Sequence, residues 1–358
     1  MRPTRGATPL ALATDVARAA LAVLVAVLVA GSVIALLGYP PIEALRALLA
    51  GALGSGPALT ATLLKFAPLA LTGLAVSLSF RCGVWNIGAE GQLYAGALLA
   101  TILATRWMPA APGWIAVPAL LAASALGGAV WASIAGALRA RRGVSEVIST
   151  ILLNFIALQL VSLAVHGPLQ EATGAYPQSD ALTAAFRLPS IGRVHMGIAL
   201  ALLLAGASSV LLFRTSVGFR MRAVGLSETA ARFAGIEPER QLVSTLALAG
   251  ALAGIAGGVE VAGVTGRLYE SLSPGYGYTA IAVALLARLH PLAVVPAAFL
   301  FAILEAGGAA MQRSAGVPSV ATDVLKGVVI LLSIGLALGS RRTRGSEPAR
   351  EDATAEAA

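Results

Sequence analysis

The sequence predicts an all-α protein that crosses a membrane many times, and three observations support this fold class. The 358 residues are 58% hydrophobic and only 12% charged, whereas soluble domains carry about 25% charged residues. The mean hydropathy is strongly positive, at +0.84. The apolar residues are grouped in long runs, and most runs are close to the roughly 20 residues that cross a bilayer core as a helix.

These runs predict about ten membrane segments. Five of them contain no Asp, Glu, Lys or Arg: Ala19–Leu37, Trp114–Leu138, Val147–Val165, Met196–Phe213 and Leu242–Val259. A sixth, Ala58–Phe80, is interrupted only by Lys65. Four weaker runs complete the set: Ile87–Thr105, Tyr276–Ala287, Leu292–Leu304 and Val324–Leu338. The two runs on either side of Pro291 are short, which fits either discontinuous helices or ordinary spans with misplaced ends.

Arginine is distributed unevenly over the segments that connect these runs. If the N-terminus is cytoplasmic and the segments alternate, 17 arginines fall inside and 6 fall outside. This asymmetry follows the positive-inside rule, and it predicts that both termini are cytoplasmic and that Gly167–Arg193 is external. The formal net charge of +8 therefore reflects membrane topology and predicts no nucleic-acid partner.

The predicted domain organisation is simple. A cytoplasmic N-terminal segment (1–18) precedes one membrane domain (19–338), and a polar tail (339–358) follows it. The tail is rich in Ala and Glu, a composition typical of disordered segments. The first apolar run is longer than the 7–15 apolar residues of a signal peptide, so we interpret it as an anchor.

Motifs for catalysis are missing from the sequence. Its two lysines, Lys65 and Lys326, lie outside any Gly-Lys-Ser/Thr motif, so the chain has no Walker A loop for ATP. Cys82 is the single cysteine, which excludes a cysteine-based metal site. We therefore expect no catalytic residue, no bound metal, no cofactor and no enzymatic activity.

Polar residues gather at the start of one weak segment, in the stretch FRCGVWNIGAEGQLYAG (80–96). Asn86 and Glu90 are four residues apart and share a helix face, and Gln92 follows them. A carboxylate at the edge of lipid is costly unless it faces protein or a water-filled path. The alternative is an interfacial helix start, with Asn86 as the cap and Glu90 near the positive helix end.

A second set of polar residues recurs every four positions along the segment 147–165: Glu146, Thr150 and Asn154. Such a stripe either holds helices together or forms a wall of the solute path. Glycine shows the same spacing at Gly250, Gly254 and Gly258. This small-xxx-small pattern predicts tight packing between helices.

A short helix is predicted on the inside at Leu226–Gly235. Gly225 and Ser227 can start it, while Gly235 and Pro238 can end it. An isolated helix of this length is marginal in water. We therefore expect it to dock on a partner or to lie on the membrane surface.

Several of these stretches resemble a known family. Thr229-Ala230-Ala231-x-x-x-Gly235 resembles the coupling loop of ABC importer permeases, Glu-Ala-Ala-x-x-x-Gly, with Thr229 in place of the first Glu. Three further stretches resemble the permeases of bacterial nucleoside (simple-sugar-type) ABC importers. They are FRCGVWNIGAEGQLYAGALLA, GVSEVISTILLNFIA and GYGYTAIAVALLARLHPLAVVPAAFLFAILEAGGAAMQ. The resemblance covers residues 58–338.

The resemblance implies a type II-like fold of about ten helices in a bacterial cell membrane, related to ribose and branched-chain amino-acid permeases. It implies three partners: a cytoplasmic ABC ATPase that hydrolyses ATP, a second related permease, and an extracytoplasmic solute-binding lipoprotein. It also implies a solute path that involves Asn86, Glu90, Gln92, Glu146, Thr150 and Asn154. The residues it implies for coupling to the ATPase are Thr229, Ala230, Ala231 and Gly235.

The expected solute is a nucleoside, and a simple sugar or another small polar solute is the alternative. A different class of protein, an ion-coupled secondary transporter, would need acidic residues deep within the spans. The acidic candidates all lie near predicted span ends: Glu90, Glu146, Glu260 and Glu305. This placement favours the ABC permease.

Overall fold

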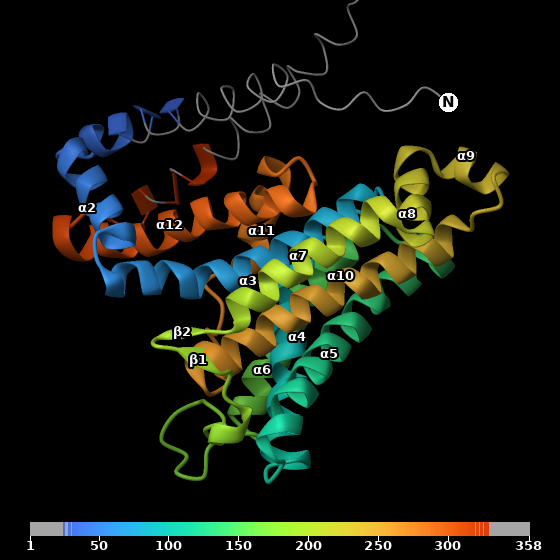
Figure 1. Ribbon diagram of the computed structural model, residues 1–358, viewed down its shortest axis with the longest axis horizontal. Coiled ribbons are helices and arrows are strands. Elements are labelled where there is room, and N and C mark those ends of the chain that lie inside the picture. The colour runs from blue at the N-terminus through green and yellow to red at the C-terminus, as the bar shows by residue number, and fades with distance from the viewer. Residues whose placement is uncertain are drawn as a thin grey trace, which may run out of the picture. The chain divides into compact units, whose positions relative to one another are not determined.

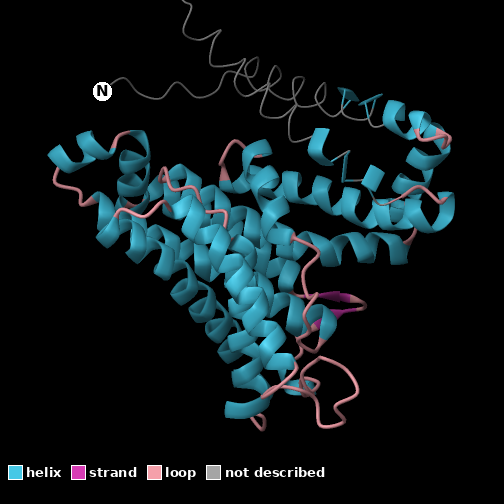
Figure 2. Cartoon of the chain, turned by 180° about the vertical axis from the view of Figure 1, so that it is seen from behind, coloured by secondary structure: helices cyan, strands magenta, loops and turns pink. Residues whose placement is uncertain are grey.

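The structure is a computed structural model that describes residues 24–25, 28–29, 31–318, 320–321, 323–324 and 326–328. The chain divides into two compact units, one of residues 43–317 and one of residues 1–42 with 318–358. In the second unit, residues 31–36 are helical. The larger unit is built almost entirely of helices and carries all the features discussed below (Figures 1 and 2).

Most of the helices follow one another with short connections. In chain order they are α2 (Pro41–Leu53), α3 (Gly56–Arg81), α4 (Ala89–Ile102), α5 (Gly113–Arg142), α6 (Glu146–Val165), α7 (Gly197–Arg214), α8 (Ser216–Leu226), α9 (Glu228–Phe233), α10 (Pro238–Glu260), α11 (Tyr276–Leu286) and α12 (Pro291–Ala315). Two π-helical turns extend α4 and α10, namely η1 (Leu103–Trp107) and η3 (Val261–Thr265). The long connection before α7 holds a 3₁₀ turn, η2 (Ala184–Phe186), and an antiparallel hairpin of β1 (Ser190–Ile191) and β2 (Val194–His195).

Six helices among the described residues are long and apolar enough to cross a membrane: α3, α5, α6, α7, α10 with its π turn, and α12. The chain is therefore an all-helical, multi-pass membrane protein, as predicted. Of the predicted segment Ala19–Leu37 the structure describes residues 24–25, 28–29 and 31–37, and of Val324–Leu338 it describes only 324 and 326–328. The predicted tails lie outside the described residues. The total of ten segments stays a prediction.

Four elements differ from the sequence-based expectation. The predicted segment Ile87–Thr105 begins only at Ala89 and ends in a π turn. The predicted helix 226–235 is shorter, because α8 ends at Leu226 and α9 runs only from Glu228 to Phe233. The run 292–304 continues to Ala315, since helix α12 tolerates the charge of Glu305 that ends the apolar run. Residues 41–53, which no predicted segment includes, form helix α2, in which Glu43 and Arg46 interrupt the apolar residues.

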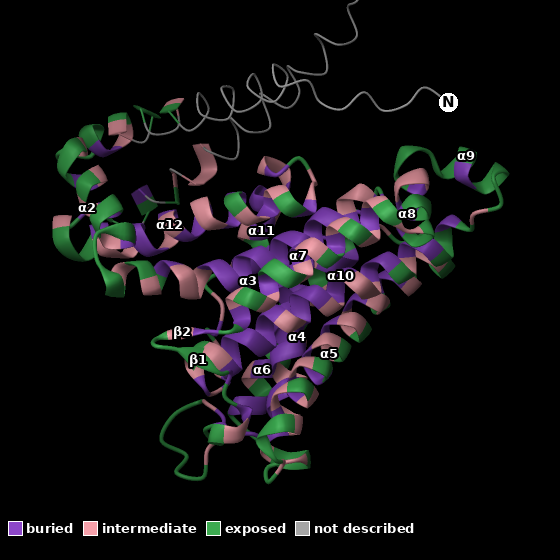
Figure 3. Cartoon of the chain, in the orientation of Figure 1, coloured by how far each residue is buried: buried purple, intermediate pink, exposed green. Residues whose placement is uncertain are grey.

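Helix α10 lies at the centre of the larger unit and packs against α3, α4 and α5. The predicted glycine seam is confirmed on its α5 face. A Cβ on Gly254 would meet the carbonyl oxygen of Ser124 and the backbone of Gly128 on α5, and one on Gly250 would meet the carbonyl of Gly128. Small residues let backbones approach in lipid, where no hydrophobic force drives helices together. Buried residues accordingly concentrate on α3, α4 and α10 (Figure 3).

Candidate functional site

The polar stretch before α4 forms a break in the helical structure. Helix α3 ends at Arg81, residues 83–88 are not helical, and α4 starts at Ala89. The turn out of α3 uses Gly83, whose φ of 80° favours glycine. Non-helical backbone at membrane depth is tolerated only where protein or water satisfies its polar groups. The neighbouring side chains therefore have to supply hydrogen bonds.

Asn154 of α6 supplies two of these bonds. Its Nδ2 donates to the carbonyl oxygen of Ile87 at 2.9 Å, and its Oδ1 accepts from the backbone N–H of Gly91 at 2.8 Å. One turn earlier on α6, Thr150 Oγ1 accepts from the N–H of Ile87 at 3.3 Å. Two members of the predicted stripe thus replace backbone bonds that the broken helix lacks.

Asn86 and Gln92 close the same break from within. The Gln92 amide donates to Asn86 Oδ1 at 2.9 Å, and the Asn86 amide donates back to Gln92 Oε1 at 3.1 Å. Asn86 Oδ1 also accepts from the N–H of Gly88 at 3.0 Å, which makes Asn86 a local turn former. Both side chains are buried. Their orientation is therefore set by a pair of reciprocal bonds.

Glu90 joins α4 to the start of α11. Its Oε2 accepts from the backbone N–H of Gly277 at 2.6 Å, so a carboxylate caps the positive end of α11. A Cβ on Gly277 would meet the backbone of Ala89 and Glu90, which explains the glycine. Four residues along α4, Tyr94 Oη accepts from the N–H of Ser273 at 3.1 Å.

The contact between Glu90 and α11 lies inside the membrane-spanning body. Helix α11 has 11 residues, a length of about 16 Å at 1.5 Å per residue. Its last residue, Leu286, precedes Arg288, one of the arginines that gather at one end of the spans. We call this end the arginine-rich side. The start of α11 is therefore about half a bilayer core away from that side.

Five of the six predicted path residues come together around this break: Asn86, Glu90, Gln92, Thr150 and Asn154. We call these five the polar cluster, and all of them are buried. The sixth, Glu146, lies apart from it. Its Oε2 forms an ion pair with Arg139 Nη1 at 3.1 Å, which joins the end of α5 to the start of α6.

Sequence reasoning did not assign the partners Tyr94, Ser273 and Gly277. The signal available was the stretch GYGYTA (275–280), where two glycines flank a tyrosine directly before an apolar run. Gly275 has a φ of 97°, a backbone conformation that residues other than glycine rarely adopt. Which turn would face Glu90 could not be derived from spacing.

The predicted coupling residues lie on a separate projection of the arginine-rich side. Ser227 Oγ caps α9 by accepting from the N–H of Ala230 at 3.2 Å, and Gly235, with a φ of 77°, follows the helix end. Thr229 and Ala230 are exposed, whereas Ala231 is only 3% exposed because it faces its own chain. Recesses of about 270 and 450 Å³ lie beside α9, lined among others by Glu228 and by Gly235.

The long connection opposite the arginine-rich side is firmly anchored. Glu171 Oε2 accepts from Gln178 Nε2 at 2.9 Å and pairs with Arg267 Nη1 at 2.5 Å. The bond from Gln178, with further ones from Thr173 and Arg267, holds the pKa of the Glu171 carboxyl below its usual range. These bonds therefore stabilise the folded connection at a pH above the usual pKa of a glutamate. The stabilisation is lost as the pH falls through the lowered pKa of Glu171.

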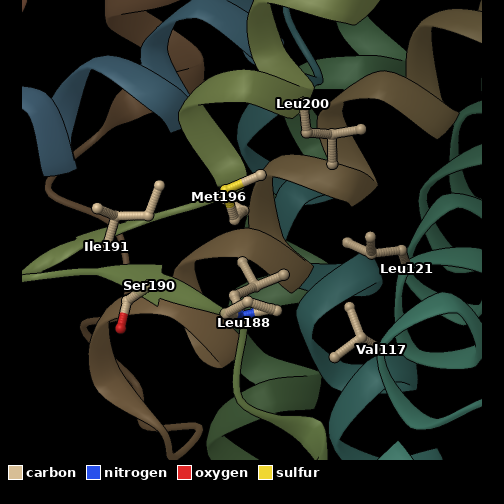
Figure 4. A pocket seen from close by; sticks show the side chains of 8 residues that line it. Val117, Leu121, Leu188, Ser190, Ile191, Met196 and Leu200 are labelled. Carbon is tan, nitrogen blue, oxygen red and sulfur yellow. The ribbon is translucent and has the colours of Figure 1, made fainter. Parts of the chain in front are cut away.

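An apolar recess of about 370 Å³ opens between α5, the hairpin and the start of α7. Figure 4 shows Val117 and Leu121 of α5 on one side and Ile191 and Met196 on the other. Ser190 is its one polar lining residue. This recess lies in a different part of the unit from the polar cluster, and its apolar lining does not suit a polar solute. Among the described residues, no group of His, Cys, Asp and Glu could hold a metal ion.

A hydrogen-bonded polar break at mid-depth in a multi-pass protein is typical of membrane transport proteins. The chain belongs to the family described as the permease component of the branched-chain amino acid transport system, which matches residues 58–334. It is therefore the permease subunit of an ABC importer, a transport component and not an enzyme. This family excludes an ion-coupled secondary transporter, and its permease role calls for no cofactor.

Three relatives show the range of solutes in this family. A glucose ABC transporter permease protein of Haloferax volcanii is 36% identical over 327 residues, 88% of this chain and 86% of the relative. A guanosine permease protein of Bacillus subtilis is 34% identical over 331 residues, 89% and 94% of the two chains. A nucleoside permease protein of Lactococcus lactis is 31% identical over 309 residues, 83% and 85% of the two chains.

Proposed function

We propose that this chain imports a nucleoside across a bacterial cell membrane, as one of two permease subunits of an ABC importer. The observation that carries the proposal is the polar cluster at the break before α4, which places amides and a carboxylate at mid-depth. The names of two of the three relatives above support a nucleoside, and the third supports a simple sugar as the alternative. The type II-like arrangement of about ten helices is part of the proposal.

Reconstitution of the complete importer in liposomes tests the solute. We expect ATP-dependent accumulation of labelled guanosine, which adenosine and uridine reduce by competition and glucose does not. Accumulation of glucose without any nucleoside would assign the sugar alternative. If none of these solutes accumulated with ATP, the proposed function would be wrong.

A second, related permease is the expected membrane partner. The Bacillus strain has a second guanosine permease protein that is 31% identical to this chain over 256 residues. The Lactococcus strain has a second nucleoside permease protein that is 24% identical over 290 residues. These pairs support a heterodimer of two permeases. An extracytoplasmic solute-binding lipoprotein would deliver the solute to it. Co-purification of a tagged copy of this chain with its partner tests the pairing.

The separate ATPase docks, in this proposal, on the projection formed by α8 and α9. Two large apolar side chains point out from it, Leu226 at 88% and Phe233 at 90% exposure. Exposed apolar residues of this size on a polar loop are typical of a protein contact. Arg220 and Arg240 line the recess beside Gly235 and add positive charge at its rim.

Replacing Phe233 with aspartate should remove most of the ATPase from the purified permease. The side chain is almost fully exposed, so the permease itself should keep its thermal stability within about 0.5 kcal/mol. Co-purification and solute-stimulated ATP hydrolysis measure the effect. Arg214→Asp is the matched control, because this exposed arginine at the end of α7 lines neither recess beside α9. Full co-purification of Phe233→Asp would exclude this contact.

Ala231 needs a different interpretation from the one that its motif suggests. It is buried against its own chain, so a tryptophan there would push α9 away from α8 and α10, the helices it packs against, instead of filling a cleft in the ATPase. Ala231→Trp should therefore lower coupling through the position of α9. Ala230→Trp, on the exposed side, should act directly on the contact surface.

The topology is tested by single cysteines on the two sides. With Cys82 replaced, Tyr176→Cys should react with an impermeant thiol reagent in intact cells, and Phe233→Cys should react only after lysis. Both positions are well exposed, at 65% and 90%, so protection reports the membrane and not burial. Labelling in the reverse order would overturn the assignment of the arginine-rich side to the cytoplasm.

A further inference from the structure

Glu260, the last residue of α10, carries a buried carboxylate without a hydrogen bond on one oxygen. Glu260 is 5% exposed, and its Oε2 atom has no hydrogen-bond partner. Four buried polar atoms of the described residues share this property: Ser77 Oγ, Arg81 Nε, His195 Nε2 and Glu260 Oε2. Glu260 supplies the one carboxylate oxygen among them. Such a group is costly inside a membrane protein, and the other buried carboxylate of this region, Glu90, is bonded.

Three polar groups from three other elements interact with Glu260 through its charge. Lys65 of α3, Tyr269 of the following connection and Tyr276 at the start of α11 all lie within range of its charge. Directly after Glu260 the helix changes to the π turn η3. Single π turns of this kind occur frequently at functional sites. A carboxylate acceptor whose charge acts on an ammonium group and two phenol hydroxyls matches a polar, hydroxyl-rich ligand.

The position of Glu260 fits an entrance and not the middle of the path. It is 22 residues after Pro238, so it lies about 33 Å from the arginine-rich end of α10. The anchored connection with Arg267 follows directly. Glu90, in contrast, lies near mid-depth. In the proposed topology, solute that arrives from outside therefore passes the level of Glu260 before it reaches the polar cluster.

We propose that Glu260 binds the transported solute at the external entrance, where its carboxylate accepts hydrogen bonds from hydroxyl groups of a sugar ring. This rests on the proposed function. Glucose and guanosine, the solutes in the names of the relatives, share such a ring. Adjacent hydroxyls can donate to the two oxygens of one carboxylate, which leaves neither oxygen unsatisfied.

Binding of labelled guanosine to the purified permease–ATPase complex in lipid nanodiscs tests the proposal without the solute-binding lipoprotein. Glu260→Gln keeps the shape and removes the charge, so we expect roughly tenfold weaker binding. 2′,3′-Dideoxyguanosine, which lacks the two hydroxyls, should bind wild type and variant within twofold of each other. Because the substitution removes a buried charge that lacks a hydrogen bond on one oxygen, the thermal stability of the variant should be unchanged or higher.

The control is Glu270→Gln, an acidic residue of the same connection whose carboxylate already accepts a hydrogen bond from Ser162. It should bind guanosine like wild type. Equal affinity of Glu260→Gln and wild type would overturn the proposal, as would a marked loss of thermal stability that accounts for weaker binding. Uptake by the complete importer with no binding to the complex would overturn the site alone. Absence of both uptake and binding would overturn the proposed function.

Discussion

Replacing Asn154 with leucine should destabilise the permease by about 2–4 kcal/mol and abolish uptake. The substitution leaves the carbonyl of Ile87 and the N–H of Gly91 without partners inside the protein. Each unsatisfied buried group costs about 1–3 kcal/mol, and lipid offers no replacement. Equilibrium unfolding of the purified permease in mixed micelles measures the loss.

Gln159→Leu is the matched control for Asn154. It makes the same change of an amide to an apolar side chain in the same helix, but Gln159 is exposed on the outer face of α6. Its effect on the free energy of unfolding should stay within about 0.5 kcal/mol. If Asn154→Leu were as stable as Gln159→Leu, the broken backbone before α4 would be satisfied in another way.

Replacing Gly254 with leucine should prevent α10 from packing on α5, at a cost above about 3 kcal/mol. A Cβ at this position would already meet the carbonyl oxygen of Ser124 and, at 3.0 Å, the Cα of Gly128. These are backbone atoms, so rotation of a side chain cannot relieve the contact. We expect little folded protein in size-exclusion chromatography and a large loss of thermal stability in the fraction that remains.

Gly206→Leu on α7 separates this effect from the general cost of changing a helical glycine. A Cβ there meets nothing within 4 Å, and leucine is the better helix former by up to about 1 kcal/mol. The control should therefore be as stable as wild type or more stable. Equal behaviour of the two variants would show that the glycine seam is not a close contact.

The polar cluster was predictable as a set of residues and unpredictable as an arrangement. Four-residue spacing placed Thr150 and Asn154 on one face of a helix, and a polar stretch before an apolar run marked Asn86 and Glu90. Spacing also placed Glu146 in the stripe, although it pairs with Arg139 instead. Periodicity defines a face of a helix, but the neighbour of that face depends on contacts distant in sequence.

The amino-acid sequence by itself determined the class of fold, the apolar spans, the arginine asymmetry and the glycine seam of α10. These properties follow from composition and local spacing, because lipid requires apolar spans and backbone bonds satisfied within each helix. Only the tertiary structure decided that Asn154 repairs the break before α4, that Glu90 caps α11 and that Ala231 faces inward. It also left the Oε2 atom of Glu260 without a hydrogen bond. Each of these facts joins residues from separate helices, and the packing of those helices brings them together.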